Sequence, residues 1–186
     1  MALNFKKMGD ASSSGALNYF RIGHYLVRVD SFRKGVNHNQ IDFVKLDGTV
    51  LYVYPDAVPT QDPTTKVMVH PHRAGEQVVQ KIMGGKDTTL GNIKHIICRC
   101  TDSPDSAVGE AEAEQALGDG QPLAGVLMEV HASFKITKAG KTFTNVHFVR
   151  RVPAGEVLSL MDAKLRDALF PNGALEAMAK EEAAAG

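Results

Sequence analysis

Apolar and polar residues alternate along several stretches of the chain with the period of two residues that is typical of β-strands. The clearest stretch runs from Val126 to Ile136, where every second residue is apolar. Thr142–Val152 follows after a turn rich in Lys and Gly, and residues 19–32 mix aromatic, β-branched and basic side chains in the same pattern. These stretches predict antiparallel strands joined by hairpins.

The region between these stretches adds three further predicted strands and one long loop. Residues 40–46 and 49–54 are predicted as two strands, because Asp47-Gly48 between them is a strong hairpin signal. Four prolines over residues 55–71 predict a loop without regular structure. A shorter strand is predicted over Glu76–Met83.

The hydrophobic period changes to that of a helix at two places. Apolar residues recur at intervals of three and four over residues 88–100, and again over Gly155–Phe170, which is predicted as one amphipathic helix. An Ala/Glu-rich stretch, residues 110–117, predicts a short exposed helix.

The order of these elements predicts a mainly β protein. We divide the chain into a flexible N-terminal arm (1–17), a β domain (18–152) with an acidic insert (101–122), and a C-terminal helix and tail (153–186). Strands with one helix before the last strand pair come close to a five-stranded, OB-fold-like antiparallel barrel. In that layout the Glu76–Met83 strand would be an accessory or a broken continuation of another strand. A β-sandwich with extra helices is the alternative, while tight hairpins argue against a doubly wound parallel sheet.

Charge is segregated along the chain, although the 21 basic and 21 acidic side chains of its 186 residues sum to zero. Residues 1–100 hold 13 Lys and Arg against 8 Asp and Glu, and residues 121–151 hold five against one. Residues 101–120 hold six acids and no base, and residues 152–186 hold six acids against three bases. The zero net charge therefore does not exclude a polyanionic partner of the basic β segments.

Four short segments resemble a known family. Gly23–Val29, Arg73–Val78, Leu90–Lys94 and the hairpin Lys135–Thr144 look like segments of the small OB-fold single-stranded DNA-binding proteins of tailed phages and prophages. The likeness covers roughly residues 18–152 and implies an OB-fold that binds single-stranded DNA. Such proteins often end in a strongly acidic tail that contacts replication partners, whereas the tail here, residues 181–186, is only weakly acidic.

Sequence-tolerant binding of a single strand needs a basic groove for the phosphates and aromatic faces for the bases. Basic and aromatic residues are interleaved in the predicted strands. The candidate nucleic-acid-binding residues are Arg21, Tyr25, Arg28, Phe32, Arg33, Lys34, Phe43, Lys45, Tyr52, Tyr54, Lys135, Lys138, Lys141, Phe143, Arg150 and Arg151.

For the aromatic candidates, the hydrophobic pattern of the strand bears on whether the ring stacks on a base or packs in the core. Phe32 and Phe43 lie near bases and turns, which favours stacking. Tyr25 shares its face with two valines, so both roles stay open for it. Tyr52 and Tyr54 are available for stacking if the aliphatic face of their strand is the core.

Metal binding and catalysis have weak support in the sequence. Cys98 and Cys100 are separated by one residue, which fits neither a zinc pair nor an ordinary disulfide. There is no complete phosphate-binding glycine motif and no nucleophile elbow. We therefore expect no enzyme activity, no metal and no cofactor, with a zinc-dependent module as a third possibility.

The function expected is non-catalytic binding of single-stranded DNA in phage replication or recombination. Candidate partners are single-stranded DNA, replication or recombination proteins and further copies of the chain. The alternative is a phage structural or assembly protein that packs through the β domain. No apolar run approaches a membrane span and residues 1–15 lack a secretory pattern, so we expect a cytoplasmic protein, in the bacterial host if phage-encoded. Residues 102–119 are expected to form a mobile appendage that competes with DNA.

Overall fold

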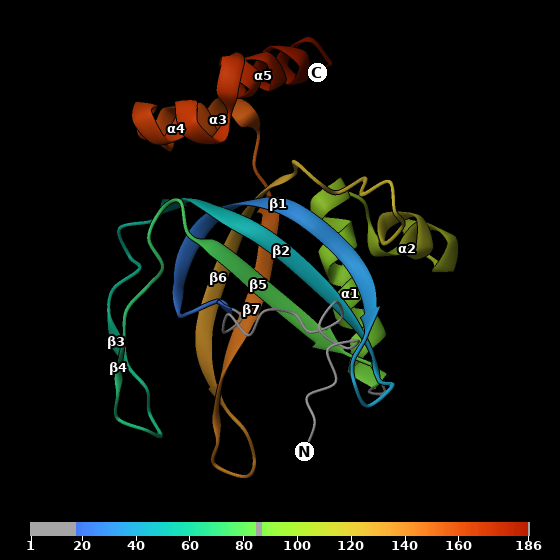
Figure 1. Cartoon of the computed structure of the whole chain (residues 1–186), viewed down its shortest axis with the longest axis vertical. Helices are drawn as coiled ribbons and strands as arrows, with labels where there is room; N and C mark the ends of the chain where they lie inside the picture. Colours follow the sequence, from blue (N-terminus) through green and yellow to red (C-terminus); the bar gives the residue numbers. More distant parts are fainter. Residues whose placement is uncertain (1–17, 85–86, 186) are drawn as a thin grey trace, which may run out of the picture.

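A computed structural model of the chain describes residues 18–84 and 87–185, so the predicted arm at 1–17 lies outside the described residues. Its main feature is a five-stranded antiparallel sheet in the order β5-β2-β1-β6-β7 (Figure 1). The strands are β1 (Gly23–Val36), β2 (Asp42–Val53), β5 (Gln77–Met83), β6 (Leu127–Ile136) and β7 (Thr142–Arg151). A mainly β protein with an antiparallel sheet is thus confirmed.

Strand β2 runs without a break through Asp47-Gly48, so the hairpin predicted there is wrong. Gly48 pairs with Val29 on one side and Val78 on the other. A Cβ at this position would lie 2.7 Å from the Val27 Cγ1 atom and 2.9 Å from the Arg28 carbonyl oxygen. Glycine is therefore needed for the close approach of strands, and β5 becomes a full member of the sheet instead of an accessory.

The loop predicted between β2 and β5 carries a small hairpin of its own. Thr60–Gln61 (β3) pairs with Met68–Val69 (β4), and the two form an arm that projects from the sheet (Figure 1). The Thr64 hydroxyl at the end of this arm donates a hydrogen bond to the Gly140 carbonyl oxygen at 3.2 Å. The arm therefore contacts the turn between β6 and β7.

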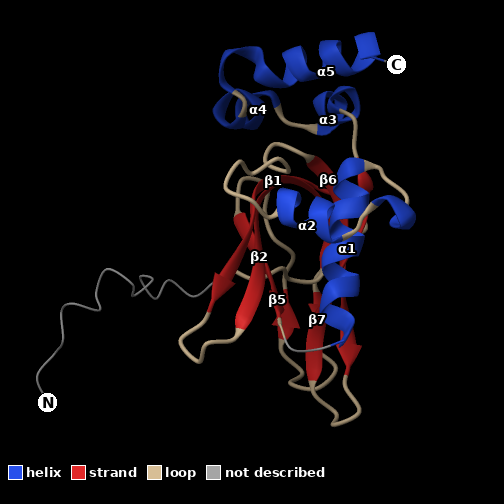
Figure 2. Cartoon of the chain, turned by 90° about the vertical axis from the view of Figure 1, so that its right-hand side faces the viewer, coloured by secondary structure: helices blue, strands red, loops and turns tan. Residues whose placement is uncertain are grey.

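The main core lies between one face of the sheet and the helix α1 (Asp87–Thr101), which stands beside β7 (Figure 2). Ile93, Ile96, Ile97 and Cys100 of α1 are buried there. The predicted helix before the last strand pair is confirmed.

The acidic segment is packed against the same core. It holds a 3₁₀ turn, η2 (Asp105–Ala107), and the helix α2 (Glu110–Ala116), which confirms the short helix predicted there. Val108, Ala116, Leu117 and Leu123 are all less than 9% exposed. These apolar anchors tie the segment to the domain, so the expectation of a loose appendage is wrong.

The C-terminal part forms three helices, and two of them replace the single long helix predicted over residues 155–170. They are α3 (Ala154–Leu160), α4 (Ala163–Leu169) and α5 (Ala174–Ala185), with the 3₁₀ turn η3 (Pro171–Gly173) before α5. Met161 is extended (ψ 141°) and ends α3, and the Asp162 side chain accepts hydrogen bonds from the backbone N–H groups of Lys164 and Leu165. An aspartate in this position caps the N-terminus of α4, so the chain begins a second helix here instead of continuing α3.

These helices cover one end of the sheet with a second apolar cluster. Leu26, Leu51 and Leu127 of the strands pack with Val157 and Leu175 of the helices. Within the described residues, no helix combines the length and apolar character needed to cross a membrane.

Candidate nucleic-acid interface

Two of the predicted stacking residues lie in the core, so their assignment to the binding surface is wrong. Tyr25 is 0% and Phe32 is 1% exposed. The Tyr25 hydroxyl donates to the Ile22 carbonyl oxygen at 2.6 Å and accepts from the His72 backbone N–H at 3.1 Å. In β1 a register shift between Val29 and Ser31 turns Phe32 to the same face as Val29, because an extra residue in one strand reverses the alternation.

A basic group with one aromatic ring lies on the opposite face of the sheet, on β1, β2 and β5. Lys45 is paired in register with Arg33 and with Lys81, and Phe43 follows on the same face of β2. We call Arg33, Phe43, Lys45 and Lys81 the β2–β5 face. The Lys81 ammonium lies 3.9 Å from the centre of the Phe43 ring.

One carboxylate partly neutralises this face. Asp47 pairs with Lys45 at 2.6 Å and with Arg33 at 3.3 Å. Three basic groups against one acid leave an excess of positive charge. Sequence reasoning missed Lys81, because treating β5 as an accessory strand hid its pairing with Lys45.

The β6–β7 hairpin brings together the second group. Lys135 lies directly opposite Phe143 across the two strands, and Phe143 is 44% exposed. Lys138 and Lys141 are exposed at the turn. Among the described residues, no acidic group lies within ion-pair distance of these three lysines. The hairpin therefore presents an exposed aromatic ring opposite one lysine, with two more exposed lysines at its turn.

The turns next to the two groups both lie away from the C-terminal helices, but at opposite ends of the β1–β6 ladder. The turn between β1 and β2 (37–41) and the turn between β6 and β7 (137–141) both lie away from helices α3–α5 (Figures 1 and 2). By register, Arg33, Phe43 and Lys45 lie beyond the start of β6, whereas the hairpin residues lie beyond the start of β1, so the two groups flank the sheet from opposite sides.

Three predicted arginines lie at the other end, where they hold the C-terminal helices. Arg28 donates to the Leu169 carbonyl oxygen at 2.8 Å, and its guanidinium carbon lies 5.3 Å from the centre of the Phe170 ring. Arg151 pairs with Glu182 of α5 at 3.0 Å. These groups are engaged within the fold.

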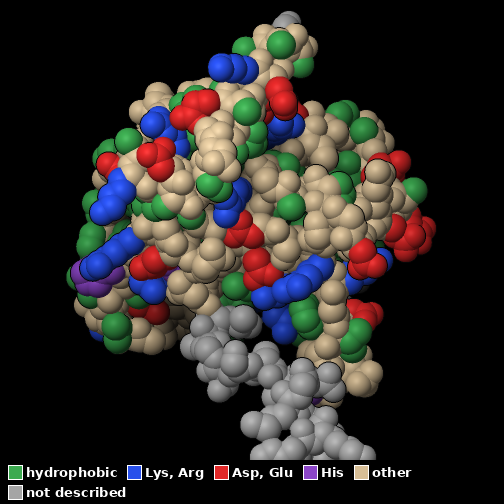
Figure 3. All heavy atoms as spheres, turned by 45° about the horizontal axis from the view of Figure 1, so that its top comes forward, with side chains coloured by type: hydrophobic (Ala, Val, Ile, Leu, Met, Phe, Trp, Pro, Cys, Tyr) green, Lys and Arg blue, Asp and Glu red, His purple; other side chains and the backbone are tan. Residues whose placement is uncertain are grey.

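Arg150 is the most strongly paired of these arginines. Its guanidinium lies 2.7 Å from Glu129 and 2.6 Å from Glu156. The hydrogen bonds between Arg150 and Glu156 raise the pKa of the arginine and lower the pKa of the glutamate. Figure 3, in which the helix-covered end is turned toward the viewer, shows basic and acidic side chains interspersed.

Tyr52 and Tyr54 are half-buried beside the C-terminal helices. The ring of Tyr54 stacks on the ring of His24, with 4.0 Å between the ring centres. Tyr52 and Tyr54 pack edge to face, with 5.2 Å between their ring centres. Burial raises the pKa of Tyr54. Both rings pack against the second apolar cluster instead of lying open with the lysines.

The remaining candidates are Arg21 and Lys34. Lys34 lies on the core side of β1 and pairs with Glu114 of α2 at 3.6 Å. Arg21 lies 4.0 Å from Glu76, at a separate pocket. Neither residue joins the two groups described above.

The part of the chain that the structure describes holds no group of three or more His, Cys, Asp and Glu side chains arranged to bind a metal ion. Cys98 and Cys100 are both buried, and burial raises the pKa of Cys100 to about 12. A buried thiol with so high a pKa stays protonated at neutral pH, so it is a poor nucleophile.

Comparison with known proteins does not place the chain in a family. No protein-family model matches it, and no curated protein sequence matches it either.

Proposed function

We propose that this protein binds single-stranded DNA without catalysing a reaction, through the β2–β5 face and the β6–β7 hairpin. The observation that carries the proposal is the half-exposed Phe143 ring among Lys135, Lys138 and Lys141, which have no acidic partner among the described residues. Base stacking on an aromatic ring contributes about 1–3 kcal/mol per base, and lysines add sequence-independent phosphate contacts.

The strand order supports an OB-like barrel that is open between β5 and β7. Counting the five strands of the sheet along the chain, the order is third, second, first, fourth, fifth, and α1 stands between the third and the fourth in sequence. OB-folds bind oligonucleotides with the face of strands two and three and with the loops that join strands one to two and four to five. The corresponding parts here are the β2–β5 face and the turns at 37–41 and 137–141.

The test is fluorescence anisotropy with labelled oligo-dT over a range of salt concentrations. We expect binding that weakens as the salt concentration rises. The plot of log K against log salt should have a negative slope, and its magnitude should decrease by about 0.7 for each phosphate contact removed. The double variant Lys138→Ala/Lys141→Ala should lower the slope by about 1.4. The matched control is Lys164→Ala/Lys180→Ala, which removes two exposed lysines from the C-terminal helices.

The control variant should bind like the unchanged protein. Absence of binding at low salt would overturn the proposal, and so would an equal loss in both double variants. A role in phage replication or recombination is part of the proposal and is supported by the sequence resemblance alone; it predicts preference for single-stranded over duplex DNA.

A second candidate function is a structural or assembly role. The β3–β4 arm exposes three apolar side chains, Val58 (57%), Val67 (61%) and Met68 (52%), which is surface suited to packing against another protein. Light scattering after size-exclusion chromatography separates the two functions. A large oligomer that forms without DNA, combined with no oligo-dT binding, favours assembly.

A further inference from the structure

A pocket of about 760 Å³ lies where the β3–β4 arm leaves the sheet and the chain returns toward β5. It is distant from the β2–β5 face, because Val53 in its wall is the last residue of β2, whereas the β1–β2 turn meets the first. Its lining residues include none of Lys135, Lys138, Lys141 and Phe143. A volume of this size is typical of sites for small molecules. Val53, Ala57, Pro71 and Ala74 give it an apolar side.

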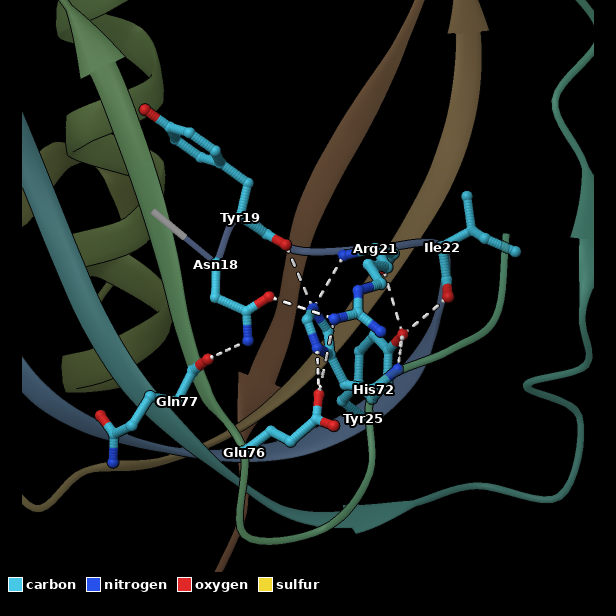
Figure 4. Close-up of polar contacts among 8 residues, drawn as sticks. All are labelled: Asn18, Tyr19, Arg21, Ile22, Tyr25, His72, Glu76 and Gln77. Atoms are coloured by element: carbon cyan, nitrogen blue, oxygen red, sulfur yellow. Dashed lines mark hydrogen bonds and ion pairs between the residues drawn. The ribbon is translucent and has the colours of Figure 1, made fainter. Parts of the chain in front are cut away.

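The buried His72 fixes another side of the pocket. Its Nε2 atom lies 3.0 Å from the Arg21 backbone nitrogen and 3.1 Å from the Tyr19 carbonyl oxygen, and its Nδ1 atom lies 2.8 Å from a Glu76 carboxylate oxygen (Figure 4). The His72 backbone N–H donates to the Tyr25 hydroxyl. This network ties the chain before β1 to the loop before β5, so the pocket wall is rigid.

Two arginines supply the charge. Arg73 is exposed and, among the described residues, has no carboxylate within ion-pair distance. The turn that carries Arg73 is attached to β2 by two backbone hydrogen bonds. The Gly75 N–H donates to the Val50 carbonyl oxygen at 2.7 Å, and the Val50 N–H donates to the Glu76 carbonyl oxygen at 2.9 Å. Gly75 has φ +89°, which favours glycine at this tight turn. The Arg21 side chain is 42% exposed and lies 4.0 Å from Glu76.

We propose that this pocket binds a phosphate monoester carried on a ring, such as a mononucleotide, either free or at the end of a nucleic-acid strand. Guanidinium groups bind phosphate through paired hydrogen bonds, and two of them face one carboxylate here, so an anion is favoured. The apolar side made by Val53, Ala57 and Pro71 accommodates the ring. This site goes beyond the proposed strand binding and does not depend on the hairpin lysines.

Isothermal titration calorimetry with dTMP, thymidine and inorganic phosphate tests the proposal on the full chain. We expect dTMP to bind more tightly than phosphate, and phosphate more tightly than thymidine. Arg73→Ala should weaken dTMP at least about tenfold, because it removes a charge-assisted contact. Ala57→Leu should weaken dTMP but leave phosphate binding nearly unchanged, because it fills the apolar side only.

The matched control is Arg99→Ala, which removes an exposed arginine of α1 outside the pocket. Absence of dTMP binding at millimolar concentration would overturn the proposal, and so would an equal loss in Arg73→Ala and Arg99→Ala. Lys138→Ala/Lys141→Ala should keep dTMP binding while weakening oligo-dT binding at low salt, so failure of the two proposals can be told apart. If the pocket serves a strand end, 5′-phosphorylated oligo-dT should displace dTMP better than 5′-hydroxyl oligo-dT; if it serves free nucleotides, both should displace it equally.

Discussion

Phe143 is the single side chain whose exposure matters most for the proposed function. Its ring stands opposite Lys135 on the outer face of the β6–β7 hairpin and is 44% exposed. We expect Phe143→Ala to weaken oligo-dT binding by about 1–3 kcal/mol, the value of one stacked base, with little change in Tm. Anisotropy titrations and thermal unfolding measure the two effects.

Ile136→Ala provides the control for this substitution. Ile136 lies in the same hairpin, is 58% exposed and is also apolar, but it has no aromatic face. An equal loss of affinity in both variants would mean that the hairpin contributes apolar surface and not base stacking.

Glu76 makes folding stability depend on pH. The hydrogen bond from His72 holds the pKa of this carboxyl below its usual value. The ionised form is therefore favoured in the folded protein, so its stabilising contribution is present above the ordinary glutamate pKa of about 4.3 and is lost as the pH falls through the lower folded value. We expect the Tm difference between the unchanged protein and Glu76→Gln to shrink on acidification below about pH 4.3. A difference that grows in acid would contradict this assignment.

The alternation of residues in β1 identified its faces only as far as Val29. Val27 and Val29 lie on one face as the alternation indicates, and that face is the core, but the register shift before Ser31 reverses the faces and Phe32 becomes buried. A bulge inserts one residue and leaves no reliable mark in the hydrophobic pattern. The exposed Phe143 could be predicted as a candidate because no such shift separates it from the turn.

At the scale of elements, the two glycines Gly48 and Gly91 should respond to alanine in opposite ways. A Cβ at Gly48 would meet Val27 at 2.7 Å and the Arg28 backbone at 2.9 Å, so Gly48→Ala should lower Tm. Gly91 is exposed in α1 with no atom within 4 Å of a Cβ, so Gly91→Ala should stabilise the protein by up to about 1 kcal/mol. Thermal unfolding of both variants checks the pair, and a neutral Gly48→Ala would show that β1 and β2 can move apart.

The helix α2 places negative charge beside Lys34 of β1, the neighbour in sequence of Arg33 in the proposed binding surface. Glu114 pairs with Lys34 at 3.6 Å between two well-exposed side chains, so the pair itself adds little stability. We expect Glu110→Gln/Glu114→Gln to raise oligo-dT affinity a few-fold at low salt and to have no effect at high salt, where charges are screened. A gain that persists in high salt would contradict an electrostatic cause.

Element types were more predictable than their boundaries. The strands β6 and β7 and the helix α1 follow from strong local periodicity. The continuity of β2 through Gly48 could not be predicted, because the reason for this glycine is a neighbouring strand and not a turn. The break between α3 and α4 could not be predicted either, because the helical spacing of apolar residues continues past Asp162, which caps α4.

At the scale of the whole molecule, charge segregation in the sequence predicted a basic β domain but could not say which bases are free. Arg28, Arg150 and Arg151 are engaged with the C-terminal helices, and only tertiary contacts reveal this. The lysines of the β6–β7 hairpin have no carboxylate within ion-pair distance among the described residues, and the acid next to this hairpin, Asp62 of the β3–β4 arm, is directed to Thr142. The sequence thus predicted that the strands are basic, whereas the fold decides which of their basic side chains are engaged in ion pairs.

The C-terminal helices and the sheet should unfold together. Leu26, Leu51 and Leu127 of the sheet are at most 2% exposed because α3–α5 cover them. Calorimetry should therefore show one unfolding transition for the full chain. Leu175→Ala leaves a cavity at the centre of this cluster. It should lower the free energy of unfolding by about 2–5 kcal/mol and shift that whole transition to lower temperature. Leu169→Ala, on the half-buried side of α4, is the control and should cost less. A separate early transition that alone responds to Leu175→Ala would mean that the helices form an independent unit, and the arginines beneath them would then be available to a nucleic acid.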